Sequence, residues 1–334
     1  LAPIRKVRFE EGDMPKLLVT RHQHFDSLLA QADALEPLRT VVVAPETDHA
    51  LAGAMSAAAR GIIHPILIGD TERIRQAAKA ANLDLGATEI VHAGSPEEAA
   101  AQGVALIHAR RAEAIMKGHL HTDELLRHIV KKDGGLRGTR RLSHVFVMDV
   151  PGLDHMLLIS DAAINIAPSL EDKVDITQNA IDLAIALGIK RPRVGILSAV
   201  ETVNPKIPST LDAAILSKMA ERGQIKGADV DGPLAMDNAV DVDAARTKGI
   251  TSLVAGRAEI LIAPNLEAGN MLAKELSFIA HAECAGIVLG ARVPIILTSR
   301  ADGEKARLVS CAVAALYHAS LTGNGTSIKR EAAE

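Results

Sequence analysis

Residues 298–302 carry the side-chain types that acyl or phosphoryl transfer requires. They read Thr-Ser-Arg-Ala-Asp and directly follow an apolar run over residues 293–297. A strand that ends at Ser299 and Arg300 would bring a hydroxyl donor and a guanidinium to the mouth of a cleft, and an enzyme that acts on a carbonyl and a phosphate needs both groups. The alternative interpretation is a strand end closed by a polar turn.

Further polar clusters lie at or just after other predicted strands. They comprise residues 117–122, the group Arg140, Arg141, Ser143 and His144 before the strand at 145, the group Ser160, Asp161 and Asn165, and residues 201–205, 231–238 and 264–270. In the first cluster Gly118 permits close approach of the backbone, and His121 and Thr122 could cap the helix that contains Arg127. Each cluster also has a structural interpretation as a helix start, a solvated cationic surface or a plain turn. Their repetition at successive strand ends favours a functional site.

The elements that must position these clusters alternate along the chain. Strands are expected over residues 40–44, 65–68, 114–116, 145–150, 156–160, 194–198, 259–263, 286–289 and 293–297. Helices are expected over 72–81, 96–110, 174–187 and 305–319, the third ended by Gly188. Strands rich in β-branched residues between Ala-rich amphipathic stretches predict an α/β protein with mostly parallel sheets.

Two domain crossings are expected. Residues 149–154 read Asp-Val-Pro-Gly-Leu-Asp, which is turn chemistry that joins antiparallel strands, and the first crossing is placed there. The second is placed near residues 298–302, so that the C-terminal helix returns to the first domain. This predicts a discontinuous first α/β domain over 1–150 and 300–334, a second α/β domain over 151–299 that supports dimerisation, and a cleft between them.

Composition narrows the classes of partner. With 334 residues and 48% hydrophobic content, the chain can form two domains with sizeable cores. Aromatic residues make up 1% of it, which argues against stacking on nucleic-acid bases. The net charge of -4 gives no broad basic field for nucleic acid or an anionic membrane. Small anions are therefore the expected partners.

The cysteines and the chain ends bear on location. Cys284 and Cys311 lie in apolar stretches without the spacing of metal ligands, so both are predicted to be reduced core thiols. A run of about 18 apolar residues and a signal-peptide pattern are both missing from the sequence, and the expected location is the cytoplasm. The chain begins at Leu1 and not at Met, which leaves open a trimmed product or part of a longer polypeptide.

The ordered set of clusters resembles the phosphate acetyltransferase and phosphate butyryltransferase family. The matching motifs are Lys117-Gly118-x-x-His121-Thr122, Ser160-Asp161-Ala-Ala-Ile-Asn165, Val200-Glu201-Thr-Val-Asn204-Pro205, Asp231-Gly232-Pro233-Leu234, Asn265-x-Glu267-Ala268-Gly269-Asn270 and Ser299-Arg300. They follow the family order from about residue 25 to residue 316. The runs at 201–205, 223–225 and 231–238 are more similar to the butyryltransferase branch.

The resemblance implies a fold and a reaction. The fold is a two-domain α/β architecture like that of isocitrate and isopropylmalate dehydrogenases, with an interdomain cleft, in a homodimer. The reaction exchanges a short acyl group, acetyl to butyryl, between coenzyme A and inorganic phosphate to give an acyl phosphate. Coenzyme A and phosphate are substrates, and neither a permanently bound cofactor nor a metal is implied.

The resemblance also implies roles for particular residues. Ser299 stabilises the oxygen of the tetrahedral intermediate, and Arg300 recognises phosphate. The residues implied in substrate binding are Lys117, His121, Thr122, Arg127, Ser143, His144, Asp231, Asn265 and Asn270. His121, Thr122, Ser143 and His144 are expected to line one cleft.

The sequence departs from the acetyltransferase branch at the position of the implied base. That branch has an aspartate seven residues after the serine, whereas this chain has Ala306. Asp302 is the replacement candidate, because it is close enough in sequence to face the same pocket. A free thiol with a pKa of about 8.5 is already a few per cent thiolate at neutral pH, and a cationic pocket raises that fraction. Arg300 and Arg127 could thus serve in place of a dedicated base.

Two other functions were weighed against acyl transfer. A decarboxylating dehydrogenase of the related fold would need clustered aspartates for a metal and a nicotinamide site, and the chain lacks a convincing Gly-x-Gly-x-x-Gly after a strand. A catalytically weakened module that binds coenzyme A or acyl phosphate for a larger enzyme is suggested by Ala306 and by the start at Leu1.

Overall fold

The computed structural model describes residues 23–298 and 302–323 of the chain. The strands in these ranges are β1 (Leu38–Val43), β2 (Ile63–Gly69), β3 (Glu89–His92), β4 (Ala114–Lys117), β5 (Ser143–Asp149), β6 (Leu157–Ser160), β7 (Arg193–Leu197), β8 (Asp229–Leu234), β9 (Ile260–Ile262), β10 (Glu283–Leu289) and β11 (Ile295–Ile296).

The helices of the described residues lie between these strands. They are α1 (Gln23–Ala32), α2 (Asp48–Ala59), α3 (Thr71–Ala80), α4 (Pro96–His108), α5 (Thr122–Ile129), α6 (Leu170–Ala186), α7 (Pro208–Glu221), α8 (Met236–Val240), α9 (Val242–Thr247), α10 (Leu266–Phe278) and α11 (Glu304–Thr322). Asp70, Ser95, Ser169 and Asn265 cap α3, α4, α6 and α10, because their side chains accept hydrogen bonds from the free backbone N–H groups of the first turn.

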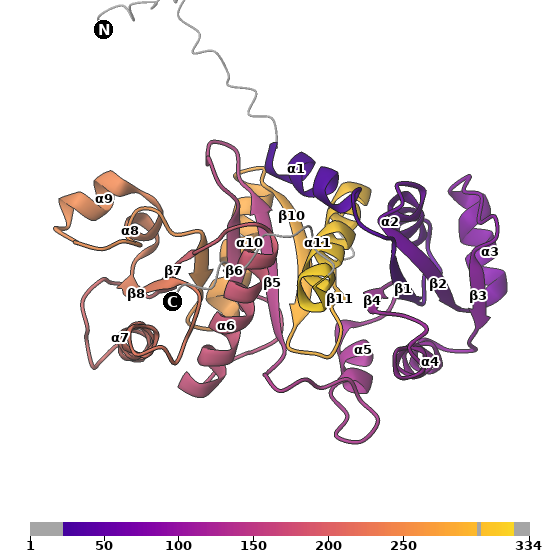
Figure 1. The fold of residues 1–334 in the computed structure, drawn as a ribbon, viewed down its shortest axis with the longest axis horizontal. Helices are drawn as coiled ribbons and strands as arrows, with labels where there is room; N and C mark the ends of the chain where they lie inside the picture. Colours follow the sequence, from indigo (N-terminus) through magenta and orange to yellow (C-terminus); the bar gives the residue numbers. More distant parts are fainter. Residues whose placement is uncertain (1–22, 299–301, 324–334) are drawn as a thin grey trace, which may run out of the picture.

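One mixed sheet runs through the described part of the chain. Its strand order is β3-β2-β1-β4-β11-β10-β5-β6-β9-β7-β8. Figure 1 shows this sheet along the long axis of the molecule, from β3 at one end to β8 at the other. The neighbours are parallel except at the centre, where β10 is antiparallel to β11 and β5, and β5 is antiparallel to β6. The strands of the two halves therefore point in opposite directions.

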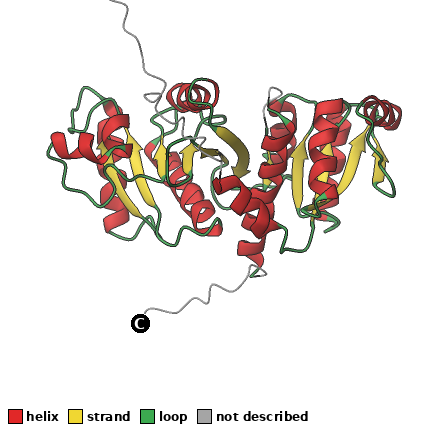
Figure 2. Cartoon of the chain, turned by 90° about the horizontal axis from the view of Figure 1, so that it is seen from above, coloured by secondary structure: helices red, strands yellow, loops and turns green. Residues whose placement is uncertain are grey.

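Helices cover both faces of the sheet (Figure 2). Buried residues of α1, α2, α6, α7 and α11 share one core with the sheet face that carries Val145 and Ile287. On the opposite face, α4 and α5 pack on the β1–β4 half, and α8, α9 and α10 pack on the other half. This second face thus has two separate cores, with the middle of β5 and β10 between them.

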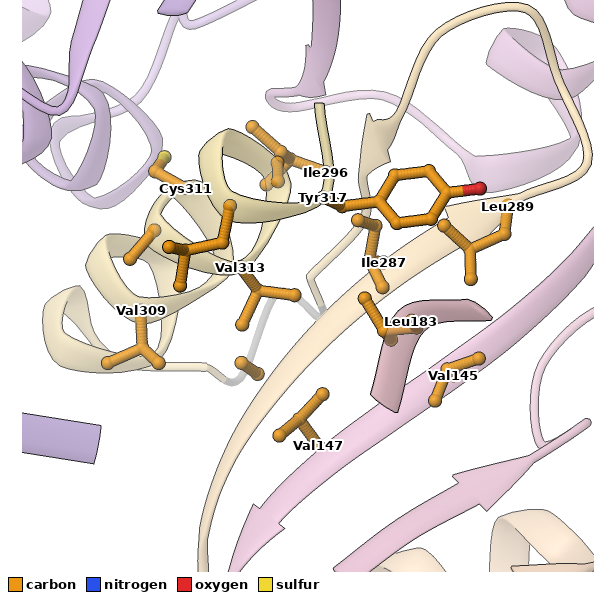
Figure 3. Packing of buried hydrophobic residues seen from close by; sticks show 14 of the residues in the cluster. Val145, Val147, Leu183, Ile287, Leu289, Ile296, Val309, Cys311, Val313 and Tyr317 are labelled. Atoms are coloured by element: carbon orange, nitrogen blue, oxygen red, sulfur yellow. The ribbon is translucent and has the colours of Figure 1, made fainter. Parts of the chain in front are cut away.

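The central strands are held by α11. Figure 3 shows Val309, Val313 and Tyr317 of this helix against Val145, Ile287 and neighbouring aliphatic residues of the sheet. Cys311 is fully buried in the same core, in agreement with the prediction of a core thiol. Because α11 packs on β10 and β11, the start of this helix is fixed relative to the end of β11.

Most predicted elements are confirmed. Each of the nine expected strands has a counterpart, the four expected helices correspond to α3, α4, α6 and α11, and Gly188 ends α6 with a φ of 98°. The turn at 149–154 joins antiparallel strands as predicted. One placement is wrong: Ser143 and His144 belong to β5 and are fully buried, so they do not form a loop before the strand.

A single cross-strand row aligns the ends of three strands. Pairing runs from Met116 to Ile296, Ile287, Val145 and Ser160. β4, β11 and β6 all end at or within one residue of this row. β4 and β11 run in the direction opposite to β6. The polar segment that follows β6 therefore begins on one side of the row, and those that follow β4 and β11 begin on the other side.

Candidate active site

The residues on either side of the segment that carries the expected chemistry make defined contacts. Ser299 and Arg300 themselves lie outside the described residues. Thr298, which precedes them, is buried, and its Oγ1 accepts a hydrogen bond of 2.8 Å from Nη1 of Arg307 in α11. Asp302, which follows them, is half-buried in the wall of a cavity. Both ends of the segment are therefore attached to the same region of the protein.

The cavity next to Asp302 has a volume of about 340 Å³. Its wall combines Phe25 of α1, the C-terminal half of α10, the start of α11 and the neighbouring strands β5 and β10. The residues that matter for its chemistry are Phe146, Ala273, Ser277, Cys284, Asp302 and Ala306. Ala306, the position at which the resemblance implied an aspartate base, lines the same cavity as Asp302.

Charged groups are concentrated around this cavity. Lys305 forms an ion pair of 2.7 Å with Glu283, and both residues line the wall. Burial raises the pKa of the Cys284 thiol to about 11, the charge of Asp302 adds to the shift, and a hydrogen bond with Ser277 opposes it. Burial lowers the pKa of Arg307, and Asp302 opposes that shift. Asp302 is thus close enough to both groups to act on them electrostatically.

His144 lies between the ends of β11 and β6. It is fully buried, its Nε2 is 3.5 Å from the carbonyl oxygen of Leu297, and its ring meets that of Phe146 edge-on at 4.4 Å. Its Nδ1 has no hydrogen-bond partner among the described residues. Burial lowers the pKa of His144, and the nearby Asp161 carboxylate opposes this shift. The imidazole is therefore neutral near pH 7, and donation to Leu297 requires the proton on Nε2.

Ser143 points to the other face of β5. Its Oγ accepts a hydrogen bond of 2.9 Å from Nδ2 of Asn179 on α6, and it is fully buried there. Successive strand residues face opposite sides of a sheet, so Ser143 and His144 cannot line the same cleft. The placement gives Ser143 a packing role beneath α6.

The Lys117 cluster begins at the end of β4, one residue beyond the cross-strand row. Lys117 is buried, and its Nζ lies 3.3 Å from the carbonyl oxygens of Gly118 and Leu120. A Cβ on Gly118 would lie 2.4 Å from the Val43 carbonyl oxygen, which confirms the predicted close approach of the backbone. The cluster is thus packed tightly against the end of β1.

The start of α5 follows this cluster. His121 is the N-cap residue, and its backbone N–H donates to the Glu124 carboxylate at 3.1 Å. Thr122 is the first helical residue, so of the two predicted cap residues the structure has His121 at the N-cap. Arg127 is exposed and pairs with Asp123 at 3.4 Å on the same helix. An exposed guanidinium held by a weak surface pair is available to an incoming anion.

The second group of predicted residues lies on the other side of the row, around the end of β6. Asn270 donates to the Ala162 carbonyl oxygen at 3.0 Å, and Asn265 caps α10 by accepting from the Ala268 backbone at 2.9 Å. Asp161 is buried and accepts hydrogen bonds from the backbone of its own loop. These contacts fix the start of α10 to the sheet.

Asp231 is separated from the first group by the width of the sheet. It lies in β8, seven strand positions from β4, or roughly 30 Å at ordinary strand spacing. Its Oδ1 accepts from the backbone of Gly232 at 2.8 Å. The structure therefore brings the predicted residues together in two groups, with Asp231 apart from both.

The cavity contains residues that sequence reasoning did not single out. Phe146 and Ser277 were not considered, and Cys284, which was predicted to be a core thiol, is partly exposed in the cavity wall. Because side chains alternate along β5, Phe146 faces the same side of the sheet as His144, and this alternation could have identified Phe146 from the sequence. The degree to which Cys284 is buried depends on how α10 and α11 pack around it, so the residues next to it in the sequence do not predict it.

Within residues 23–298 and 302–323, no cluster of three or more His, Cys, Asp or Glu side chains is arranged to hold a metal ion. Over the same ranges, no helix has the length and apolar character needed to cross a membrane.

Comparison with known proteins defines the class. The profile of the family "Phosphate acetyl/butaryl transferase" matches residues 95–315. A phosphate acetyltransferase of Rhizobium meliloti is 59% identical over 88% of this chain and 93% of its own length. A phosphate butyryltransferase of Clostridium beijerinckii is 41% identical over 89% of this chain and 98% of its own length. The molecule is therefore an acyltransferase.

Solved structures agree with this assignment. A branched-chain phosphotransacylase from Enterococcus faecalis V583 aligns with a TM-score of 0.72 and 29% identity over 84% of this chain and 99% of its own. A 4-hydroxythreonine-4-phosphate dehydrogenase from Klebsiella pneumoniae, at 13% identity, shares the fold with a TM-score of 0.52 over 85% of this chain and 99% of its own. The chain belongs to the phosphate acetyl/butyryl transferase family. The higher identity to an acetyltransferase does not support the expected preference for the butyryl branch.

Proposed function

We propose that the chain transfers a short acyl group between coenzyme A and inorganic phosphate beside the cavity at Asp302. The observation that carries this location is that Asp302, three residues after Ser299 in the chain, lines a cavity of about 340 Å³ together with apolar groups. The thioester carbon would meet phosphate at the rim, where the 299–302 segment supplies hydroxyl, guanidinium and carboxylate groups.

The reaction makes defined demands on these groups. A phosphate oxygen attacks the thioester carbon, a C–O bond forms, and the carbonyl oxygen becomes an oxyanion. When this intermediate collapses, the C–S bond breaks and sulfur leaves with the electron pair before it takes a proton. In the reverse direction the thiol must lose that proton before it attacks the acyl phosphate.

One residue of the 299–302 segment meets each of these chemical requirements. Ser299 donates to the oxyanion, Arg300 binds phosphate, and Asp302 exchanges the thiol proton. Ala306 cannot replace Asp302 in this role, because a methyl group neither binds nor releases a proton.

The surrounding groups receive binding roles. Lys117, His121, Thr122 and Arg127 would bind the phosphates of the substrates from the β4–α5 side, and Asn265 and Asn270 would support the facing side. His144 would act from beneath β11, whereas Ser143 and Asp231 are left out because of their positions.

We extend the proposal to the organisation of the molecule. The domains are 1–150 with 300–334 and 151–299, in an isocitrate dehydrogenase-like arrangement with the active site in the interdomain cleft. The reversal of strand direction at β5 and β10 supports this division. Exposed Met271 and Phe278 on α10, and Ile279 directly after it, support a homodimer formed through the second domain. The free thiols Cys284 and Cys311 support a cytoplasmic location.

A catalytically weakened binding module is not favoured. The relatives that match over nearly nine tenths of this chain are named as transferases, at 59% and 41% identity. Tight ligand binding without turnover would be needed to revive that alternative.

The test is phosphate-dependent release of free thiol from acetyl-, propionyl- and butyryl-CoA. We expect activity in the native chain and a loss of at least about a hundredfold in kcat for Ser299→Ala and Arg300→Ala, the size typical of a lost oxyanion or charge contact. Asp302→Asn should reduce the rate of coenzyme A attack on acyl phosphate most strongly at low pH, where little thiolate is present.

Matched control variants distinguish a loss of activity at the proposed site from a general loss of folding. Ser217→Ala on α7 and Arg292→Ala before β11 remove the same side-chain types elsewhere and should retain activity. Full turnover in both the Ser299 and Arg300 variants would refute the site. A native chain without phosphate-dependent thiol release from any of the three substrates would refute the function.

A further inference from the structure

The residues that line the cavity beside Asp302 differ in polarity between its buried and its exposed parts. Ala273 and Ala282 are buried, Phe146 and Cys284 are half-buried, and Lys305 at the rim is exposed. The most buried lining residues are therefore apolar, whereas the charged residues of the wall, Glu283, Asp302 and Lys305, are half-buried or exposed. A ligand that fits this gradient has an uncharged hydrocarbon end and a polar end at which chemistry occurs.

Small side chains create the space. Ala273, Ser277 and Ala282 come from α10 and the loop after it, and Cys284 comes from the adjoining strand β10. Each would remove volume from the cavity if it were replaced by a larger aliphatic residue. At about 340 Å³ the cavity lies at the lower end of small-molecule pockets, which run from about 300 Å³ upward.

Ser277 and Cys284 lie together in the wall. The Ser277 hydroxyl donates to the Ala273 carbonyl oxygen at 2.9 Å, and a hydrogen bond joins Ser277 to the Cys284 thiol. Both side chains are satisfied locally, so neither requires a polar group from a ligand. These two side chains therefore affect a ligand through the space that they leave in the cavity.

We infer that this cavity binds the acyl chain of the thioester, and that Ser277 and Cys284 set the longest chain it accepts. The inference rests on the proposed function, because the thioester carbon must lie at the rim beside Asp302. The space beyond the rim extends past what an acetyl group fills, so propionyl and butyryl groups are accommodated as well.

The test narrows the cavity from α10. In Ser277→Leu, kcat/KM for butyryl-CoA should fall at least about tenfold more than kcat/KM for acetyl-CoA, since a methylene in a fitted pocket changes discrimination by about 10- to 200-fold. Leu is a good helix former, so α10 is preserved. Ser277→Val provides a smaller step in the same direction and should give an intermediate effect.

A closely matched control is available on α7. Ser217 donates to the Ala213 carbonyl oxygen at 2.9 Å, four residues earlier in its helix, as Ser277 does to Ala273. Ser217→Leu should leave the ratio of butyryl to acetyl activity unchanged. If Ser277→Leu lowered kcat/KM equally for all acyl-CoA substrates, the inference would be overturned. The cavity would then be assigned to the pantetheine arm that these substrates share.

A second readout does not depend on turnover. At alkaline pH, where part of the Cys284 thiol is ionised despite its raised pKa, iodoacetamide should alkylate the partly exposed Cys284 and spare the fully buried Cys311. Without coenzyme A present, butyryl phosphate should slow alkylation of Cys284 more than acetyl phosphate at the same degree of saturation. Equal protection by the two ligands would contradict the inference, even in a preparation that failed the test of the proposed function.

Discussion

His144 is a neutral buried histidine at the junction of the two groups of predicted site residues. Phe146 and the Leu297 carbonyl group surround its ring, and Asp161 is the charge that favours protonation. Because burial outweighs the attraction of Asp161, the folded protein disfavours the imidazolium form. The residue is suited to supporting the backbone that leads to Ser299.

This histidine makes stability depend on pH. An unfolded histidine titrates near a pKa of about 6.5, and the folded pKa is lower, so the unfolded state binds more protons between these values. The free energy of unfolding should be undiminished above about pH 6.5 and should fall as the pH decreases below it. In His144→Phe this decrease should be smaller, as measured by urea unfolding between about pH 7.5 and about pH 5.

Other histidines provide the comparison. Burial also lowers the pKa of His128 and His318, so part of the pH dependence should remain in the variant. His64→Phe changes an exposed histidine of β2 and should leave the native pH dependence intact. Identical slopes in the native chain and in His144→Phe would show that His144 does not contribute.

At the scale of elements, the close contact between β10 and the end of β11 is decisive for the site. A Cβ on Gly286 would lie 2.4 Å from the Leu297 carbonyl oxygen and 2.9 Å from Nε2 of His144. Only a residue without a side chain allows this approach. The backbone that leads to Ser299 therefore depends on a glycine in the neighbouring strand.

Gly286→Ala should disturb both stability and catalysis. The added methyl group must displace a backbone carbonyl group, and overpacking of this kind typically costs about 1–3 kcal/mol. We expect a lower denaturation midpoint together with a loss of thiol-release activity. In Gly94→Ala the new Cβ would meet Glu98 at 3.5 Å, an ordinary contact, so this variant should behave as the native chain does. Equal behaviour of the two variants would argue against the role of Gly286.

Some of the elements that the sequence patterns missed have weak local signals, although α2, α7 and α10, which were not predicted either, are full-length helices. β3 is a short edge strand without a fully buried residue, and α8 and α9 have five and six residues. β8 was not predicted because Asp231 and Gly232 interrupt any apolar run. By contrast, β1, β2 and α4 were predictable, since buried aliphatic runs and a Ser-Pro helix start are local features.

At the scale of the whole molecule, the proposed homodimer would cover exposed apolar side chains on α10 and at Ile279 directly after it. Met271 and Ile279 are 64% and 74% exposed, which is costly for aliphatic groups that contact only water. Sedimentation velocity should show the native chain as a dimer, and the double variant Met271→Glu, Ile279→Glu should be a monomer. Leu321→Glu on α11, which changes another exposed aliphatic residue, should remain a dimer. A monomeric native chain at assay concentration would contradict the proposed dimer.

The sequence alone determined most of the strands, some of the helices, the ordered motifs and hence the family, because each of these depends on residue types and on local spacing. Tertiary structure decided where the motif residues meet. The antiparallel centre of the sheet sends the Lys117 and Asp161 segments to opposite sides of one row, and α6 covers the face of β5 to which Ser143 points. The cavity at Asp302 likewise depends on tertiary structure, because Phe25 of α1 and Phe146 of β5 are distant in sequence from α10, β10 and α11 and meet them only when their apolar surfaces are buried together.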